Sequence, residues 1–472
     1  MSRPAERRRA APWWAPPALL AACFAIQLHA YRWGVITPDT VEQYGQALTG
    51  RYDDWHPPAT AWLWRQLMAF GPGSAPILIF HALLYWTGFA LIVEGLRRRG
   101  DRTGMALAVL CAVLPIPFGQ MGAILKDPLL AAACLCAAGL IFLRGEVAGR
   151  GRAFCVAGAA VLLVFASALR FNAVFATAPL FAALLPERWL ARPGRALATL
   201  IGAAAILSGA NRLIDDVALA PHHSRPFFSL LNFDLAGIVA HGGDQAYPDL
   251  DPATARAVTA ACYDPGLYNP HYRPACDMVE DRLVDWAAAH HQGPVAIWLH
   301  AIAGNPVAYA RHRLAHLNRN WRLFVPDVPN DAVYAMTTPN DYGLAFTGNR
   351  LTAAIGRAAR AMALSPAGRP ATWLAIALGL LLIGPRLRSR RLVIALAASA
   401  LLYGSAYALV SVAPDMRYNL WTMLAAVLAL VLAISDLRAG GVRGLTRWRL
   451  VAAALPVALA IAAEVLALEA GS

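Results

Sequence analysis

Residues 37–58, with the sequence TPDTVEQYGQALTGRYDDWHPP, form a polar segment between two strongly apolar stretches at 13–32 and 74–96. A stretch of about 20 apolar residues is long enough to cross the hydrocarbon core of a membrane as a helix. The polar segment is therefore predicted to be a loop at the membrane surface. It holds four acidic residues and one histidine, so it is also a candidate site for chemistry.

The composition of the chain indicates a membrane protein. Hydrophobic residues make up 58% and charged residues 15% of the 472 positions, whereas a typical soluble domain has about 25% charged residues. The net charge of +13 would suggest a nucleic-acid partner in a soluble protein. Here the arginines cluster between apolar stretches, as they do in cytoplasmic loops, so no nucleic-acid partner is expected.

Eleven apolar stretches are predicted to span the membrane, which makes the chain an all-α polytopic membrane protein. The N-terminal sequence resembles a signal peptide, but with so many later spans an uncleaved first helix is the preferred interpretation. The predicted spans lie at 13–32, 74–96, 104–120, 128–143, 153–169, 171–186, 195–213, 371–385, 391–410, 419–435 and 449–468.

Arginine-rich connections set the orientation, because cytoplasmic loops carry an excess of basic residues. With the N-terminus in the cytoplasm, the long central loop and the C-terminus are extracytoplasmic. The predicted location is the plasma (inner) membrane of a bacterium. The inner loops are then short and rich in arginine, and they fall at 97–102, 144–152, 187–195, 386–391 and 436–449.

Three regions follow from this topology. Residues 1–213 hold the first seven spans together with the first outer loop (33–73). Residues 214–370 form a mostly helical extracytoplasmic domain inserted between spans, and residues 371–472 hold the last four spans. The inserted region has 14 acidic and 12 basic residues, so it is nearly neutral in a basic chain.

The inserted region is predicted to contain helices and one candidate disulfide. Cys262 and Cys276 lie there, and they could pair if the compartment is oxidising. The other five cysteines lie in apolar stretches and are interpreted as small core residues. The helices are predicted at 255–261 and 277–290, with amphipathic helices in the membrane interface at 294–321 and 351–364.

Four outer segments collect polar residues that packing between apolar helices does not explain. We expect these turns to converge on one face of the protein. An alternative for the first loop is a capping box, in which Asp39 and Glu42 only start a helix. The residues are Asp39 and His56 in the first loop, Lys126 and Asp127 in GAILKDP, Arg170 and Asn172 in ALRFN, and Asp415 and Arg417 in APDMRY.

Lys126 is unusual because every other basic residue in the chain is arginine. Lysine offers a compact, rotatable charge that suits a phosphate oxygen. Arg170 and Arg417 are basic residues at an outer membrane edge, which suggests an anionic partner. Contact with lipid phosphates is the alternative interpretation for these arginines. Together the three cations could neutralise a phosphate or diphosphate at the outer leaflet.

This constellation predicts transfer of a group from a lipid phosphate. The cations would stabilise the negative charge that builds on the leaving phosphate, and a nearby carboxylate would remove the proton of the acceptor. The sequence has neither a Walker loop nor a Rossmann glycine pattern. ATP is not available on the outer face, so an activated lipid is the expected donor.

The arrangement of these motifs resembles the GT-C class of membrane glycosyltransferases, which use polyprenyl-phosphate sugars. The resemblance implies inverting transfer of a hexosyl or pentosyl group to a glycan, lipid or protein acceptor, with Asp39 as the catalytic base. The motifs are PDTVEQY, DDWHPP, the Lys-Asp turn, LRFN, NFDLAGIV in the long loop and DMRY before a late apolar helix. The predicted substrate-binding residues are His56, Lys126, Asp127, Arg170, Asn172, Asp234 and Arg417.

Three points stay open. Many members of the class pair two acids in the first loop, whereas Thr40 follows Asp39 here, so Asp53 or Asp54 is an alternative base. Asp234, in an otherwise apolar stretch, either faces the substrate cleft or caps a helix. Metal dependence varies within the class, so a divalent cation is a candidate cofactor, although the sequence presents no convincing set of ligands.

Two other functions are considered. An O-antigen ligase or polymerase also has many spans and a large outer loop, and it would depend on residues of that loop such as Arg311, His312 or Arg319. A flippase or transporter of lipid-linked sugars would place ionisable residues within the membrane and often shows repeated halves. Only His81 and Glu464 are clear candidates for such residues, and no internal repeat is visible.

Overall fold

The computed structural model describes residues 15–243, 245–266, 274–326, 332–440, 442 and 444–471. Within these residues the chain is helical, and β-type pairing is limited to three isolated bridges. Of the first predicted span, residues 13 and 14 lie outside the described residues.

Seven of the described helices are long and apolar enough to cross a membrane. This confirms the prediction of an all-helical, polytopic membrane protein. Each of the seven coincides with a predicted span. They are α4 (Ala75–Arg98), α7 (Lys126–Leu143), α8 (Gly149–Ser167), α11 (Pro193–Arg212) with its continuation η2 (Leu213–Leu219), α19 (Arg390–Val410), α20 (Leu420–Arg438) and α21 (Arg447–Gly471).

The other four predicted spans coincide with shorter apolar helices, so the total of eleven stays a prediction. These helices are α1 (Ala15–Ala30), α5 (Arg102–Ala112), α9 (Ala173–Ala182) and α18 (Pro370–Ile383).

The prediction of one continuous helix over 104–120 is wrong. Proline disfavours a helical conformation in the residue before it, and Leu114, before Pro115, has a non-helical ψ of 130°. A new short helix, α6 (Pro115–Gln120), begins there.

Helix α7 lies at the centre of the bundle and is almost wholly buried. It packs closely on α4 through glycines, as small residues allow in membrane helices. A Cβ added at Gly88 would lie 2.9 Å from the backbone nitrogen of Cys136, and one at Gly139 would lie 2.8 Å from the Gly88 carbonyl oxygen. The first residues of α7, Lys126 and Asp127, are therefore fixed in the middle of one end of the bundle.

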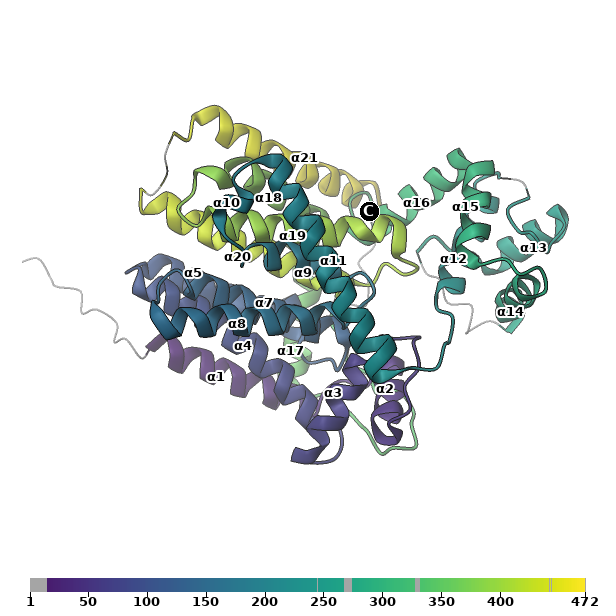
Figure 1. The fold of residues 1–472 in the computed structure, drawn as a ribbon, viewed down its shortest axis with the longest axis horizontal. Coiled ribbons are helices and arrows are strands. Elements are labelled where there is room, and N and C mark those ends of the chain that lie inside the picture. The colour runs from purple at the N-terminus through teal and green to yellow at the C-terminus, as the bar shows by residue number, and fades with distance from the viewer. Residues whose placement is uncertain are drawn as a thin grey trace, which may run out of the picture.

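The first loop folds over the same end of the bundle as α7's N-terminus. It contains α2 (Pro38–Thr49), α3 (Ala59–Leu67) and the short η1 (Met68–Phe70), and α2 and α3 lie at the end of the molecule toward α12–α16 (Figure 1). Backbone bridges join Val35 to Ala123 and Ile36 to Thr337. Segments far apart in the sequence thus meet beside α2.

The helices between residues 227 and 321 form a unit with its own apolar cluster, which includes Phe228, Leu231, Leu235 and Leu283. The disulfide Cys262–Cys276 is present and links the second of these helices to the third, with a Cα–Cα distance of 5.7 Å. The predicted helices at 255–261 and 277–290 are confirmed. The unit consists of α12 (Phe227–Ala240), α13 (Pro252–Cys262), α14 (Pro274–Ala289), α15 (Pro294–Gly304) and α16 (Pro306–Trp321).

The two segments predicted to be amphipathic bury different kinds of residue. The segment 294–321 is broken at Asn305, before Pro306, and the polar residues His312, Arg313 and His316 of α16 are buried in the protein. Helix α17 (Arg350–Ala363) instead buries small residues against α6 and exposes its arginines.

Candidate active site

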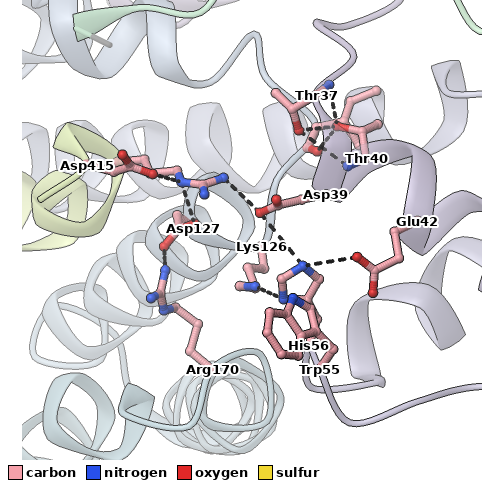
Figure 2. Close-up of polar contacts among 12 residues, drawn as sticks. Thr37, Asp39, Thr40, Glu42, Trp55, His56, Lys126, Asp127, Arg170 and Asp415 are labelled. Atoms are coloured by element: carbon pink, nitrogen blue, oxygen red, sulfur yellow. Dashed lines mark hydrogen bonds and ion pairs between the residues drawn. The ribbon is translucent and has the colours of Figure 1, made fainter. Parts of the chain in front are cut away.

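Helix α2 begins with a capping box, but not the one considered from the sequence. Thr37 is the N-cap, its hydroxyl accepts a hydrogen bond from the Thr40 amide, and the Thr40 hydroxyl accepts one from the Thr37 amide. The Thr40 hydroxyl also donates to the Ile124 carbonyl at 2.9 Å, which ties α2 to the segment before α7. The capping role of Asp39 and Glu42 is therefore wrong, and the Asp39 carboxylate projects into the space above α7 (Figure 2).

Asp39 meets Arg417, as the predicted convergence of the outer turns requires. Arg417 Nη1 lies 2.9 Å from Asp39 Oδ2, and its Nε lies 3.0 Å from Asp415 Oδ2 and 3.8 Å from Asp127 Oδ2. One guanidinium thus connects carboxylates from α2, α7 and the segment before α20. The fixed planar fork of arginine suits such multiple contacts.

Lys126 contacts the first loop through His56 and is mostly buried. A protonated lysine can only donate, so when Lys126 carries its charge His56 Nδ1 accepts and Nε2 carries the hydrogen. His56 Nε2 lies 3.9 Å from Asp39 Oδ2 and 3.7 Å from Glu42 Oε2. The imidazole therefore lies between the lysine and two carboxylates (Figure 2).

The electrostatic environment separates the roles of these groups. Burial, together with the positive charge of Lys126, lowers the pKa of His56 to about 3, so the imidazole is neutral at physiological pH. Burial alone would raise the pKa of Asp39, but the positive charges of Arg417 and Lys126 outweigh it and hold that pKa well below its usual range. Asp39 is thus a carboxylate at any physiological pH.

The pKa of Glu42 is shifted in the opposite direction from that of Asp39. Its pKa is raised to about 7, first by partial burial and then by the negative charges of Asp53 and Asp39. The carboxyl group accepts a hydrogen bond from Gln46 at 3.4 Å. Glu42 therefore changes its charge near neutral pH, while Asp39, one helical turn earlier, does not.

Arg170 and Asp127 form a buried ion pair beside Lys126 (Figure 2). The Arg170 guanidinium also lies 4.4 Å from the centroid of the Tyr418 ring and donates to Asn172 Oδ1 at 3.4 Å. Its side chain is only 12% exposed, so it faces the protein and does not extend to lipid phosphates. The Tyr418 contact was not recognised in the sequence, although the motif DMRY contains it.

Asp53 and Asp54 point to other partners. Asp53 accepts hydrogen bonds from Gln46 at 2.7 Å and from the Trp55 amide at 3.0 Å. Asp54 pairs with His223 at 2.9 Å and accepts from the Ser224 amide. Both acids hold the first loop in place, and neither carboxylate takes the position between the cations that Asp39 occupies.

Asp234 lies in a separate buried network within the unit α12–α16. It accepts hydrogen bonds from Trp298, His312 and Arg313 and is fully buried. The structure therefore does not bring Asp234 to the site around Asp39, and Asp234 lies in the middle of α12 and does not cap it.

The residues named for the ligase and transporter alternatives lie outside the site around Asp39. Arg311 and Arg319 are exposed on α16, whereas His312 is buried. His81 hydrogen-bonds to the Met121 carbonyl, and Glu464 accepts from Thr372 within the bundle. Among the residues that the structure describes, no group of three or more histidine, cysteine, aspartate or glutamate residues is placed to hold a metal ion.

The chain shares sequence features with a known enzyme family. Residues 55–209 match the family described as dolichyl-phosphate-mannose-protein mannosyltransferase. This range contains His56, Lys126, Asp127 and Arg170, whereas Asp39 precedes it. The resemblance to GT-C membrane glycosyltransferases is thereby confirmed. No curated protein matches the sequence significantly.

Two solved structures are similar to most of this chain. The archaeal oligosaccharyltransferase AglB from Archaeoglobus fulgidus, in complex with an inhibitory peptide and a dolichol-phosphate, is 15% identical with a TM-score of 0.38, over 98% of this chain and 56% of that chain. ArnT from Cupriavidus metallidurans, bound to undecaprenyl phosphate, is 13% identical with a TM-score of 0.34, over 92% and 79%. This chain thus spans little more than half the length of the archaeal enzyme.

Proposed function

We propose that this protein transfers a hexosyl or pentosyl group from a polyprenyl-phosphate donor to a glycan, lipid or protein acceptor on the outer face of a bacterial plasma membrane. The observation that carries the proposal is the convergence of Asp39, Lys126, Arg170 and Arg417 in one partly buried site. These residues come from four separate outer turns, and together they provide a carboxylate beside three cations.

Lys126 is the best candidate for the first contact with the donor phosphate. Arg170 and Arg417 are each bonded to carboxylates, whereas Lys126 contacts an imidazole, so a phosphate oxygen could bind Lys126 without displacing a carboxylate. Arg417 would add a second contact as the phosphate competes with Asp39 for its guanidinium. Loss of that contact would raise the basicity of Asp39 when the donor is in place.

In the reaction, Asp39 accepts the proton of the acceptor hydroxyl as its oxygen forms a bond to the anomeric carbon. The bond from that carbon to the phosphate oxygen breaks, and the electron pair leaves with the polyprenyl phosphate. Attack from the face opposite the phosphate inverts the anomeric configuration. The cations stabilise the charge that develops on the phosphate, which is commonly the largest catalytic contribution.

The topology that supports this proposal has eleven spans, with the regions 1–213, 214–370 and 371–472 as predicted from the sequence. The Cys262–Cys276 disulfide supports an oxidising compartment for the inserted region. The C-terminus lies toward the same end of the molecule as α2 (Figure 1), in agreement with an odd number of spans and a cytoplasmic N-terminus.

The proposal is tested with purified protein in liposomes and a panel of radiolabelled polyprenyl-phosphate hexoses and pentoses. Transfer of label to a membrane extract of acceptors, with release of polyprenyl phosphate, is expected for one donor. Movement of a lipid-linked sugar between leaflets without a new glycosidic bond would contradict the proposal. Loss of transfer on replacing Arg311 but not Asp39 would favour the ligase alternative.

A further inference from the structure

The segment 411–419, which connects α19 to α20 and carries Arg417, is held at both ends by helix α16. At its start, Arg313 Nη1 donates to the Ser411 carbonyl at 2.7 Å. At its end, the Asn419 amide group donates to Asn320, to the backbone oxygen at 3.2 Å and to Oδ1 at 3.0 Å. Arg313, Asn320 and Asn419 are buried, so these anchors are protected from water.

Arg313 is itself fixed by the unit α12–α16. Its Nη2 donates to Asp234 Oδ2 at 2.6 Å, and Asp234 also accepts from Trp298 at 2.7 Å and from His312 Nε2 at 2.8 Å. A Cβ at Gly237 would lie 2.1 Å from His312 Nδ1, so only glycine allows this imidazole to lie against α12. The carboxylate of Asp234 thus has three donors that define its position.

We infer that Arg313, oriented by Asp234, is a positioning residue for the proposed transfer reaction and acts through Arg417. The inference rests on the proposed function. Arg417 contacts carboxylates of α2 and α7 while its own backbone belongs to the anchored segment. A shift of that segment would change the Arg417–Asp39 contact. Asp234, predicted from the sequence to bind substrate, would then contribute by fixing Arg313.

Arg313→Lys is the variant of choice, because it keeps a positive charge opposite buried Asp234 but loses the fork that reaches two acceptors. We expect kcat for sugar transfer to fall about tenfold, the thermal midpoint to change little and the KM for the acceptor to be unchanged. Arg357→Lys, at an exposed position of α17, is the matched control and should match wild type.

A double-mutant cycle separates positioning from a general effect on folding. In an Arg417→Lys background, Arg313→Lys should reduce transfer no further, whereas an additive loss would overturn the inference. Asn419→Ala removes the other anchor without leaving a buried charge, and it decides the question if Arg313→Lys does not fold. It should give the same kcat loss and the same non-additivity.

The outcomes also distinguish this inference from the proposed function. Impaired transfer in Arg417→Lys with normal transfer in both Arg313→Lys and Asn419→Ala would overturn the positioning role alone. Normal transfer in Arg417→Lys would overturn both the role of Arg417 and this inference.

Discussion

The guanidinium of Arg417 lies 2.9 Å from the carboxylate of Asp39, although 378 residues separate them in the chain. The contact joins the loop after α1 to the segment before α20, and it explains why Asp39 stays ionised although it is largely buried. A carboxylate that is already ionised can accept a proton without first losing one. In the proposed reaction this requires that the donor phosphate takes over the contact with Arg417. The following predictions test this arrangement.

Asp39→Asn should reduce sugar transfer by about 10²–10⁴-fold, the usual contribution of a positioned general base. The amide is nearly the same size and keeps a hydrogen-bond acceptor for Arg417, so folding should be preserved. Initial rates with a saturating polyprenyl-phosphate sugar provide the measurement. Asp285→Asn, at an exposed position of α14, is the control, and near-normal transfer by the Asp39 variant would exclude Asp39 as the base.

Lys126→Met should weaken binding of polyprenyl phosphate by about 10- to 100-fold, because a charge-assisted hydrogen bond contributes about 1.5–3 kcal/mol. Methionine keeps an unbranched side chain at this buried position. Direct binding to the protein in detergent measures the effect. Unchanged affinity in a folded variant would show that Lys126 does not contact the phosphate.

Arg170→Gln should destabilise the protein by up to about 3–5 kcal/mol, since the buried Asp127 loses its closest ion-pair partner and keeps only Arg417, at 3.8 Å. Adding Asp127→Asn should restore part of this loss, because the carboxylate charge is then absent. Thermal unfolding in one detergent compares the single and double variants. Arg357→Gln is the exposed control, and strictly additive losses would argue against the ion pair.

Glu42→Gln should change how stability depends on pH. The native state raises the Glu42 pKa from 4.5 to about 7, so it binds the proton more tightly than the unfolded state does. Stability in the wild type therefore falls as pH rises from about 4.5 to about 7 through this group. The variant should unfold at a higher temperature than wild type at pH 8 and at the same temperature near pH 4.5.

Unfolding temperatures measured across that pH range test the Glu42 prediction. Asp285→Asn should remain parallel to wild type throughout. A difference between Glu42→Gln and wild type that does not vary with pH would mean that Glu42 keeps its ordinary pKa.

The helices could be predicted well because apolar length is a local property of the sequence. The stretch 128–143 sufficed to locate α7, and the sole lysine drew attention to its first turn. Whether a long apolar stretch forms one helix or two was harder to predict, as the break before Pro115 shows. Apolar composition alone does not indicate a change of backbone direction. The break lies directly before Pro115, the first of two prolines in that stretch.

The pairing of charges could be predicted only in outline. The sequence predicted Asp39, Lys126, Arg170 and Arg417 on one side of the membrane, but it did not indicate that Arg170 pairs with Asp127. Asp234 is a lone acid in an apolar stretch, and such a residue can equally face a substrate or form a buried ion pair. Only the packing of α12 on α16 shows that its partners are His312 and Arg313. Such choices depend on contacts between distant segments, which local pattern does not encode.

The separation of Asp39 and Arg417 also bears on biogenesis. Synthesis at roughly 5–20 residues per second leaves about 20–80 seconds between the two residues, which are 378 positions apart. Throughout that interval Asp39 has been made but Arg417 has not, so the contact between them cannot form. A ribosome that stalls before Arg417 would release a product with most of its membrane helices but with Asp39 lacking this partner.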